Sequence, residues 1–514
     1  MAGHNLNPLA NLNRTTGKPM NSSKFDRQQL TLESQQAVPE AYDTQQRLLV
    51  PIAGSWATPS TWSPVATPVD GTTFANLPIL NAAQTAAAVE SAAKEFRPWS
   101  ERSLSSRASA IAQGVDSLRT HRDLLVHLLA WEIGKTIAAA SNDVDRCIGG
   151  IDWYLEQIGP MLEQRRPLGL ISNIASWNYP FSVLLLNVLV QILSGNAAIA
   201  KIPTLGGGVS LTLAVGLLKR AGLPISLVGG RGQDLTQSLV AHPAIAGLAF
   251  VGGRANGTAV AQQLRGTTKR YALEMEGVNT YSITAFTNWD SLGKQIRAGF
   301  DFGKQRCTAY TRWVVERSLV PTFLDTYINA VSTLRVGHPL LGLPVDFGPL
   351  ISPVRVKSLR ESIASAKAAG AEVLYQGRLA DDAFTPDQDR ASYMAPTLLC
   401  GVKTPNELYL REPFAPIDVV VPVDSEEQLI AEANVSGGAL VASVATDDTG
   451  SAGERISRNL QAFKVGINKL RSRGDKEEEF GGLGRSWEGA FVGGENLVRA
   501  FTDGPQPIRG NWQG

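Results

Sequence analysis

The chain has 514 residues, 43% of them hydrophobic and 18% charged, so it is long enough for two or three domains with large cores. Its 48 basic and 47 acidic side chains leave a formal net charge of +1, which gives no overall field to attract nucleic acid or an anionic membrane. Three scattered cysteines exclude a disulfide framework and a CxxC zinc pattern, and five dispersed histidines argue against a histidine-rich metal site.

The N-terminal region is polar. Residues 1 to about 45 are rich in Asn, Gln, Ser and Thr and have weak periodicity, so they predict an extension or arm. The opening stretch MAGHNLNPLANLNRTTGKPM lacks the apolar core of a signal peptide. The longest apolar run, FSVLLLNVLVQIL, is short for a membrane span. We therefore expect a cytoplasmic protein.

Helices and then alternating strands and helices follow the arm. Residues 80 to 158 carry apolar side chains three and four positions apart, which is the helical period. From residue 168, helices are predicted to open at Pro180, Gly207, Gln233 and Arg254. Between them, five short apolar runs predict strands: GLISNIA, NAAIAKI, PISLVGG, GLAFVGG and RYALEME. This alternation predicts a parallel sheet with helices on both faces.

A second α/β series occupies the C-terminal half. Its predicted strands are TRWVVERS, AEVLYQG, PIDVVVPV, ALVASVA and FKVGINK, with helices such as SPVRVKSLRESIASAKAAG between them. Cys307 falls near the boundary between the two series, so we expect an active site between two domains.

Cys307 has an unusual setting, in GKQRCTAYTR. Lys304, Arg306 and Arg312 surround it in the sequence, and a cationic neighbourhood favours the thiolate that attacks carbon. A buried structural thiol is the alternative at this position, and it is the preferred interpretation for Cys147 and Cys400.

Three further patterns are weak one by one. FVGGRANG, at 250 to 257, joins a strand to a helix through glycines, where a phosphate can bind or where there is merely a tight turn. LEMEGVN places Glu274 and Glu276 at a strand end, where a carboxylate can act as a base or simply face water. ASWNYPF places Asn178 before a helix, where its amide can stabilise an oxyanion or cap the turn.

Taken in chain order, these patterns are specific. SWNYP, AKIP, FVGG with its later glycine, LEMEG, GKQRC, EPFAP and FGG resemble the motif series of the aldehyde dehydrogenase superfamily. The resemblance runs from about residue 48 to the end and includes IAGSW, WEIGK and YMAPTLL.

The resemblance implies an α/β fold with a Rossmann-type cofactor-binding domain, a second α/β catalytic domain and a small oligomerisation element. In these terms we expect an arm over residues 1–47 and the cofactor-binding domain over 48–285. The catalytic domain is expected over 286–465, and a C-terminal segment, 466–514, is expected to return to the cofactor domain and the oligomer interface.

The resemblance also implies roles for individual residues. Cys307 would attack the aldehyde carbon, Asn178 and the backbone N–H of Cys307 would hold the oxyanion, and Glu274 would activate the water that hydrolyses the thioester. The cofactor-binding residues implied are Ser176, Trp177, Lys201, Thr204, Gly252, Gly253, Arg254, Glu412 and Phe414.

The sequence departs from the family pattern at several points. Glu276 stands where a glycine is usual, FVGG lacks a hydroxyl near the phosphate, GKQ replaces SGQ, and Ser176 replaces a proline. These departures leave open an unusual substrate, slow turnover or lost activity.

The resulting prediction is oxidation of an aldehyde to a carboxylic acid with NAD or NADP. The alternatives are an acylating, thioester-forming member of the superfamily and a non-catalytic binding protein that kept the fold. Thr204 stands where many NAD-using relatives carry a glutamate, and Arg254 adds a cation, so we expect NADP to be accepted. Lys304 and Arg306 suggest an anionic substrate.

The predicted assembly is a homodimer. Only PMLEQRR, residues 160 to 166, bridges the place where family members usually carry a β-hairpin that adds to a neighbouring subunit's sheet. Seven residues are too few for two strands and a turn. The hairpin-mediated tetramer is therefore expected to be weakened or absent, with dimer contacts made by helices and a C-terminal strand.

Overall fold

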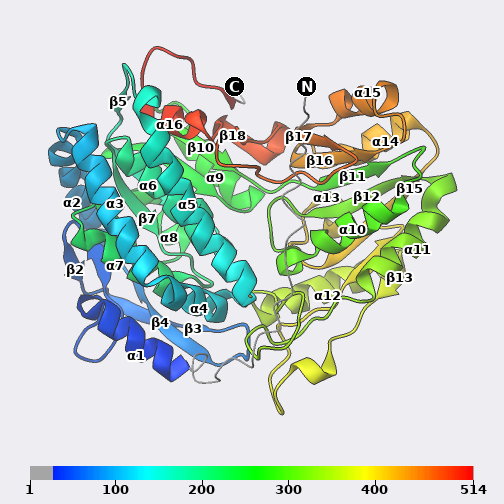
Figure 1. The fold of residues 1–514 in the computed structure, drawn as a ribbon, viewed down its shortest axis with the longest axis horizontal. Coiled ribbons are helices and arrows are strands. Elements are labelled where there is room, and N and C mark those ends of the chain that lie inside the picture. The colour runs from blue at the N-terminus through cyan, green and yellow to red at the C-terminus, as the bar shows by residue number, and fades with distance from the viewer. Residues whose placement is uncertain (1–26, 513–514) are drawn as a thin grey trace, which may run out of the picture.

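In the computed structural model, residues 27–512 are described, and they form two seven-stranded sheets and three short two-stranded ribbons. Each large sheet lies in its own half of the molecule, with helices packed around it (Figure 1). The first sheet runs β20 (Gly510–Asn511), β18 (Trp487–Ala490), β10 (Arg270–Glu274), β9 (Ile245–Val251), β6 (Leu170–Ile174), β7 (Ala197–Lys201) and β8 (Ile225–Val228). The second runs β13 (Glu372–Gln376), β14 (Thr397–Cys400), β15 (Ile417–Val423), β12 (Tyr310–Glu316), β11 (Asn279–Ile283), β16 (Ala439–Ala445) and β17 (Ala462–Ile467).

Both sheets are parallel at their centres. Strands β10, β9, β6, β7 and β8 pair in parallel, and so do β14, β15, β12, β11, β16 and β17. Antiparallel pairing is confined to the margins, where β18 meets β10 and β13 meets β14. Strand β7, AAIAK, is buried along its whole length, as expected for a parallel strand covered on both faces. The parallel α/β prediction is confirmed for both halves.

The helices of the first half are α2 (Ala82–Ser100), α3 (Leu104–Thr120), α4 (Arg122–Ile133), α5 (Ile137–Met161), α6 (Leu186–Leu193), α7 (Gly208–Arg220), α8 (Gly232–Thr236) and α9 (Arg254–Leu264). Helices α2 to α5 cover the predicted helical region, residues 80–158, and the later helices begin at or near the predicted starts, where a π-helical turn, Pro180–Leu185, precedes α6. Local chemistry fixes their starts: the Asn81 side chain accepts from the Gln84 N–H and the Gln84 side chain accepts from the Asn81 N–H, a reciprocal cap for α2. Helices α2 and α6 pack on β7, and α7 packs on β8.

The second half contains α10 (Trp289–Gly299), α11 (Val320–Val331), α12 (Pro353–Ala368), α13 (Glu407–Leu410), α14 (Glu426–Ala433) and α15 (Ser451–Asn459). After β17 the chain returns to the first half, where β18, α16 (Glu495–Ala500) and β20 lie against the first sheet (Figure 1).

Two predictions about domain limits need correction. The predicted cofactor-binding domain, residues 48–285, includes β11. The structure places β11 instead as a central strand of the second sheet. The chain therefore crosses between the halves at residues 275–278, directly after β10. It returns after β17, which extends past the expected limit of 465 to Ile467.

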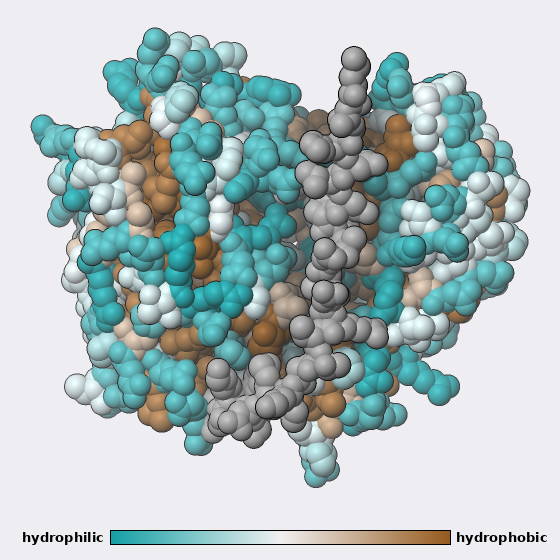
Figure 2. Space-filling model, in the orientation of Figure 1, coloured by the Kyte–Doolittle hydropathy of each residue, from teal (hydrophilic) through white to brown (hydrophobic). Residues whose placement is uncertain are grey.

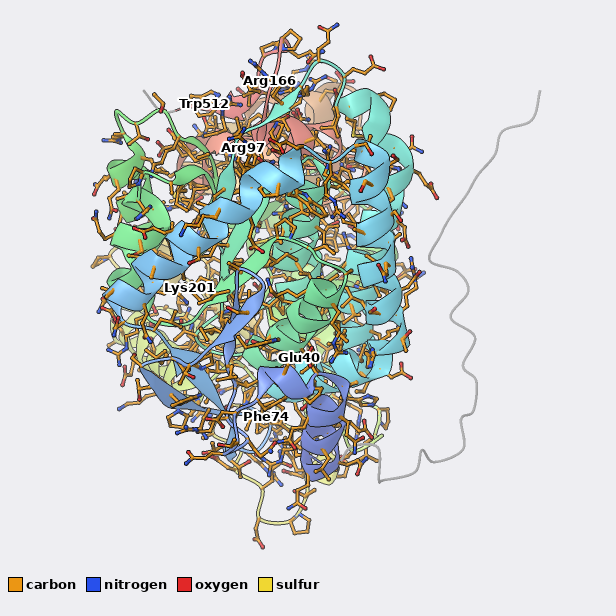
Figure 3. The ribbon with its side chains drawn as sticks, turned by 90° about the vertical axis from the view of Figure 1, so that its left-hand side faces the viewer. Glu40, Phe74, Arg97, Arg166, Lys201 and Trp512 are labelled. Carbon is orange, nitrogen blue, oxygen red and sulfur yellow. The ribbon has the colours of Figure 1, made fainter. Side chains whose placement is uncertain are left out.

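Part of the predicted arm is also folded. Residues 1–26 lie outside the described residues, but α1 (Arg27–Ala37) buries Leu30 and Ser34, and Val38 and Ala41 are fully buried. Glu40 accepts two hydrogen bonds from the Arg220 guanidinium on α7, at 2.7 and 2.8 Å, which ties this segment to the first half (Figure 3). The composition that suggested an arm did not reveal this packing.

The region between α5 and β6 is short, as the sequence predicts. In the described structure it contains one strand, β5 (Arg166–Pro167), which pairs antiparallel with β19 (Thr502–Asp503) of the same chain. A hairpin with two strands does not fit between Met161 and Leu170.

On the face drawn in Figure 2, hydrophilic side chains cover most of the described surface and hydrophobic ones show between them. Within residues 27–512, no helix is long and apolar enough to cross a membrane.

Candidate active site

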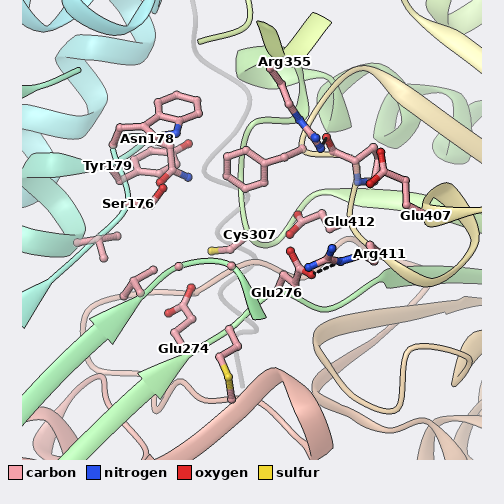
Figure 4. A pocket seen from close by; sticks show the side chains of 18 of the residues that line it. Ser176, Asn178, Tyr179, Glu274, Glu276, Cys307, Arg355, Glu407, Arg411 and Glu412 are labelled. Atoms are coloured by element: carbon pink, nitrogen blue, oxygen red, sulfur yellow. Dashed lines mark hydrogen bonds and ion pairs between the residues drawn. The ribbon is translucent and has the colours of Figure 1, made fainter. Parts of the chain in front are cut away.

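A cavity of about 310 Å³ lies between the two halves and collects most of the predicted site residues (Figure 4). Its lining comes from the carboxyl ends of β6, β9 and β10 in the first half and from the Cys307 turn and residues 407–414 in the second. The predicted residues that line it are Ser176, Trp177, Asn178, Gly252, Gly253, Glu274, Cys307, Glu412 and Phe414. Because parallel strands end at the same edge of a sheet, positions far apart in sequence meet there.

The turn that carries Cys307 has an unusual backbone. Phe302, Gly303 and Lys304 all have left-handed φ values, of 53°, 60° and 60°. Beyond the turn, the Asn279 side chain donates to the carbonyl oxygens of Cys307, at 2.8 Å, and Ala309, at 3.0 Å. The cysteine backbone is thus held from β11, while its half-buried side chain faces the cavity.

The cations beside Cys307 in the sequence do not act on its sulfur in the predicted way. The Lys304 ammonium is buried and bound by both Asp418 oxygens, at 2.6 and 2.7 Å. The buried Arg312 guanidinium is bound by Glu432. Arg306 donates to the Gly299 carbonyl at 3.0 Å and lies 3.5 Å from an Asp301 oxygen. None of the three lines the cavity, so the predicted cationic surroundings of the thiol and the predicted attraction of an anionic substrate by Lys304 and Arg306 are wrong.

The thiol lies instead among carboxylates. Burial raises the pKa of Cys307 well above its usual value, the Glu274 carboxylate raises it further, and Glu412 adds to the effect. The Arg473 guanidinium opposes them and lowers it. The free protein therefore holds Cys307 mainly as a thiol at neutral pH.

Glu274 lies at the end of β10 and is 2% exposed. One of its oxygens, Oε2, accepts from Arg473 Nη1 at 3.1 Å, whereas Oε1 is buried without a hydrogen-bond partner in the described structure. A carboxylate with one free acceptor beside a thiol is placed to take a proton from the thiol or from a water molecule.

Asn178 is buried and its amide nitrogen donates to the Gln305 carbonyl at 3.0 Å. This bond brings the Asn178 amide beside the Cys307 turn, two residues before the cysteine. A carboxamide nitrogen has two N–H donors, so one remains for a developing oxyanion.

The residues present fit a dinucleotide. Gly253 is the N-cap of α9 and leaves its first backbone N–H groups without a side-chain cap, which is the arrangement that binds a phosphate. The buried Glu412 Oε1 has no hydrogen-bond partner among the described residues, and a ribose hydroxyl would provide one. Burial and the nearby Glu276 and Glu274 raise the pKa of Glu412.

Three predicted cofactor-binding residues lie outside the lining of this cavity: Lys201, Thr204 and Arg254. Lys201 ends β7 at the same sheet edge, and its ammonium donates to Thr204 Oγ1 and to the Ile202 carbonyl, both at 2.9 Å. Burial lowers the pKa of Lys201 to about 8. Arg254 donates to the Glu276 carbonyl at 3.1 Å.

Several residues of the site were not predicted. Arg473, Arg355 and Arg411 bring cations to carboxylates or carbonyls around the cavity, and Asn279 anchors the cysteine turn. Arg473 and Glu274 are 199 positions apart in the sequence, and no local pattern links them. Among the described residues, no group of three or more His, Cys, Asp or Glu side chains could hold a metal ion.

Comparison with known proteins agrees with the fold. The profile of the "Aldehyde dehydrogenase family" matches residues 56–504. The chain is similar to a 2-aminomuconic semialdehyde dehydrogenase of Danio rerio, with 29% identity over 85% of this chain and 92% of that protein.

Many solved structures have the same fold. Two of them are HpcC from Thermus thermophilus, with a TM-score of 0.84 and 23% identity over 93% of this chain and 94% of that one, and an NADP-dependent glyceraldehyde-3-phosphate dehydrogenase from Bacillus halodurans, with a TM-score of 0.81 and 23% identity over 89% and 98%.

The family match, over a chain with two α/β sheets and a cysteine between them, identifies an oxidoreductase that acts on aldehydes. The chain belongs to the aldehyde dehydrogenase family, and the predicted resemblance is confirmed.

Replacing Glu274 tests the electrostatics of the thiol. Because the Glu274 carboxylate raises the pKa of Cys307, Glu274→Gln should move the pH profile of Cys307 alkylation by iodoacetamide to lower pH. Arg473→Gln removes a cation that lowers the same pKa and should move the profile to higher pH. Mass spectrometry of the Cys307 peptide measures both shifts, and identical profiles in the wild type and the two variants would show that neither Glu274 nor Arg473 affects the pKa of Cys307.

Proposed function

We propose that the chain oxidises an aldehyde to a carboxylic acid, with NAD or NADP, through a covalent thioester on Cys307. The observation that carries the proposal is the meeting of Cys307, Glu274 and Asn178 on one cavity that also contains the uncapped start of α9. A nucleophile, a base and an oxyanion donor are the groups that this chemistry requires.

Cys307 would attack the aldehyde carbon as the thiolate, forming a carbon–sulfur bond. Since the pKa of the thiol is raised, Glu274, with Oε1 free, is the group that takes the thiol proton. The Asn178 amide would stabilise the oxyanion of the resulting hemithioacetal. Glu274 would release the thiol proton to solvent and then, as the carboxylate, remove a proton from the water that attacks the thioester. The carbon–sulfur bond breaks, the carboxylic acid leaves, and the proton held by Glu274 returns to the Cys307 thiolate.

A dinucleotide, when bound, would supply the acceptor for the two electrons that leave as the hemithioacetal becomes a thioester. Gly252 and Gly253 would hold its diphosphate and Glu412 a ribose hydroxyl. A structural relative is described in complex with NADP and another with NAD, which supports either cofactor. We propose that NADP is accepted, because Thr204 is uncharged and Lys201 lies beside it.

The substrate class proposed is an anionic semialdehyde. A second cavity, of about 480 Å³, is lined by Arg473, which pairs with Glu274, and by Arg146. Its lining also contains Lys476 and the acidic residues Asp475, Glu477 and Glu478. A guanidinium suits a carboxylate, since it can donate two parallel hydrogen bonds. The Danio rerio relative named above is a semialdehyde dehydrogenase, a name that denotes an aldehyde carrying an acid group.

The covalent mechanism predicts that Cys307→Ala abolishes NAD(P)H production, read at 340 nm, while calorimetry still detects cofactor binding. Cys400→Ala is the matched control and should retain activity, because Cys400 lies in β14, away from the cavity. Glu274→Gln should form NAD(P)H slowly in a first turnover and then stall, since both the thiol and the hydrolytic water lose the group that accepts their proton. Wild-type turnover by Cys307→Ala would refute the mechanism.

The substrate proposal predicts that semialdehydes exceed uncharged aldehydes of equal length in kcat/KM, and that the advantage shrinks as salt is added. Arg146→Gln should remove most of that advantage by raising KM, because Arg146 lines the second cavity without contacting Glu274 or Cys307. An unchanged preference in the variant, or a preference of the wild type for uncharged alkanals, would count against it.

For assembly we propose a homodimer, supported by the short connection that holds only β5 between α5 and β6 in the described chain. Light scattering of the full chain at micromolar concentration should give the mass of two chains. A stable mass near four chains would show that another contact replaces the missing hairpin.

A further inference from the structure

The cofactor cavity contains a carboxylate that the proposed mechanism does not use. Glu276 lies two residues beyond β10, where the family pattern leads us to expect a glycine. Its Oε1 accepts from Arg411 Nε at 2.8 Å, and both residues line the cavity (Figure 4). Glu276 belongs to the segment that follows the first sheet, and Arg411 belongs to the second half. This ion pair therefore joins the two halves at the cavity.

The other oxygen of Glu276 lies near the start of α9. A Cβ placed on Gly253 would lie 3.7 Å from Glu276 Oε2, and apart from Gly253 and its two chain neighbours no other atom of residues 27–512 comes within 4 Å of that point. Gly253 is the N-cap of this 11-residue helix and offers no capping side chain. The first-turn N–H groups and the positive end of the helix attract an anion. The Glu276 carboxylate thus lies beside the place proposed for the diphosphate.

Glu412 gives an independent indication that a ligand belongs here. Its side chain lines the same cavity, is 6% exposed, and leaves Oε1 without a hydrogen-bond partner among the described residues. Leaving a buried acceptor unpaired is unfavourable, and a hydroxyl of a bound ligand would remove that cost. The cavity therefore offers an acceptor for a hydroxyl and, at the start of α9, donors for an anion.

We propose that Glu276 determines cofactor affinity by competing with the diphosphate for Arg411 and for the start of α9. In the free protein Glu276 holds Arg411. When NAD or NADP binds, the diphosphate takes Arg411 as its partner and Glu276 moves away from Gly253. This inference rests on the proposed function, since it takes a dinucleotide as the ligand.

The surroundings of the two side chains favour such an exchange. The Glu276 side chain is 17% exposed, so water screens its repulsion of a diphosphate only in part. The Arg411 side chain is 48% exposed and makes no other hydrogen bond through its side chain in the described structure, so it can turn toward a new partner. Arg254 adds a cation on the α9 side, but its guanidinium donates to the Glu276 carbonyl rather than to the carboxylate.

Calorimetric titration with NAD and with NADP, in the absence of aldehyde, tests the exchange. Tryptophan fluorescence gives a second binding signal, because one of the ten indoles, Trp177, lines the cavity. Glu276→Gln keeps the side-chain size and removes the charge, and it should lower the Kd for both cofactors about tenfold, since it relieves a like-charge contact. Glu276→Gly should act in the same direction.

Arg411 provides the second part of the test. Arg411→Gln should raise the Kd about tenfold, because a charge-assisted partner of the diphosphate is lost. The same replacement in the Glu276→Gln background should also raise the Kd. If Arg411 served only to bind Glu276, Arg411→Gln would leave the Kd unchanged in the Glu276→Gln background, and that result would overturn the proposal.

Glu407→Gln is the charge-matched control. Glu407 also lines the cavity, but its Oε1 accepts from Ser362 at 2.5 Å, away from α9, so its replacement should change the Kd far less. If Glu407→Gln lowered the Kd as much as Glu276→Gln does, the effect would be one of general charge, and the proposal would be overturned. Unchanged affinity in both Glu276 variants would also overturn it. If the folded wild type and every variant bound no dinucleotide, the proposed function itself would be wrong; wild-type binding with no Glu276 effect refutes this inference alone.

Discussion

The position of the nucleophile depends on one buried ion pair. The Lys304 ammonium is completely enclosed and is bound by both oxygens of Asp418 and by the Tyr310 carbonyl, at 2.7 Å. The Tyr327 hydroxyl donates to the same Asp418 carboxylate at 2.6 Å. Removing one partner from such a pair typically costs about 3–5 kcal/mol, because a charge is left buried without compensation. This contact ties the turn before Cys307 to β12, β15 and α11 at once.

That anchoring explains the backbone of the turn. A left-handed φ at non-glycine residues such as Phe302 and Lys304 persists only where the surroundings enforce it. Gln305 completes the constraint, because its side chain accepts from the Ile351 N–H at 3.0 Å and donates to the Pro349 carbonyl at 3.1 Å. Its own carbonyl then accepts from Asn178. Lys304 thus fixes the geometry of the turn before Cys307. The charges that shift the pKa of the Cys307 thiol are those of Glu274, Glu412 and Arg473.

The sequence alone predicts the architecture well, because parallel strands covered on both faces must be apolar throughout and leave recognisable runs. It also identifies Cys307, Glu274 and Asn178 as residues that line one cavity. It misjudges Lys304 and Arg306, since a sequence does not show which way a side chain points in an irregular turn. The partner of Lys304 lies 114 positions away, in another strand. Helix α1 was missed for a related reason: in its RQQLTLESQQA, only Leu30 and Ser34 are buried, too few to form an apolar stripe.

Three polar contacts at the cavity join the two halves of the molecule: Asn178 to Gln305, Glu274 to Arg473 and Glu276 to Arg411. In each, one partner lies at the end of the first sheet and the other on the second half or the segment that returns from it. Since Asn178, Glu274 and Glu276 are each paired across this boundary, a small shift of one half against the other would change the proposed oxyanion donor, the base and the anion site together. The halves are also joined covalently at the crossing segment between β10 and β11, which carries Glu276. Glu276 lies only two residues after Glu274, the last residue of β10. A movement of Glu276 when an anion binds in the cofactor cavity would therefore also affect the position of Glu274.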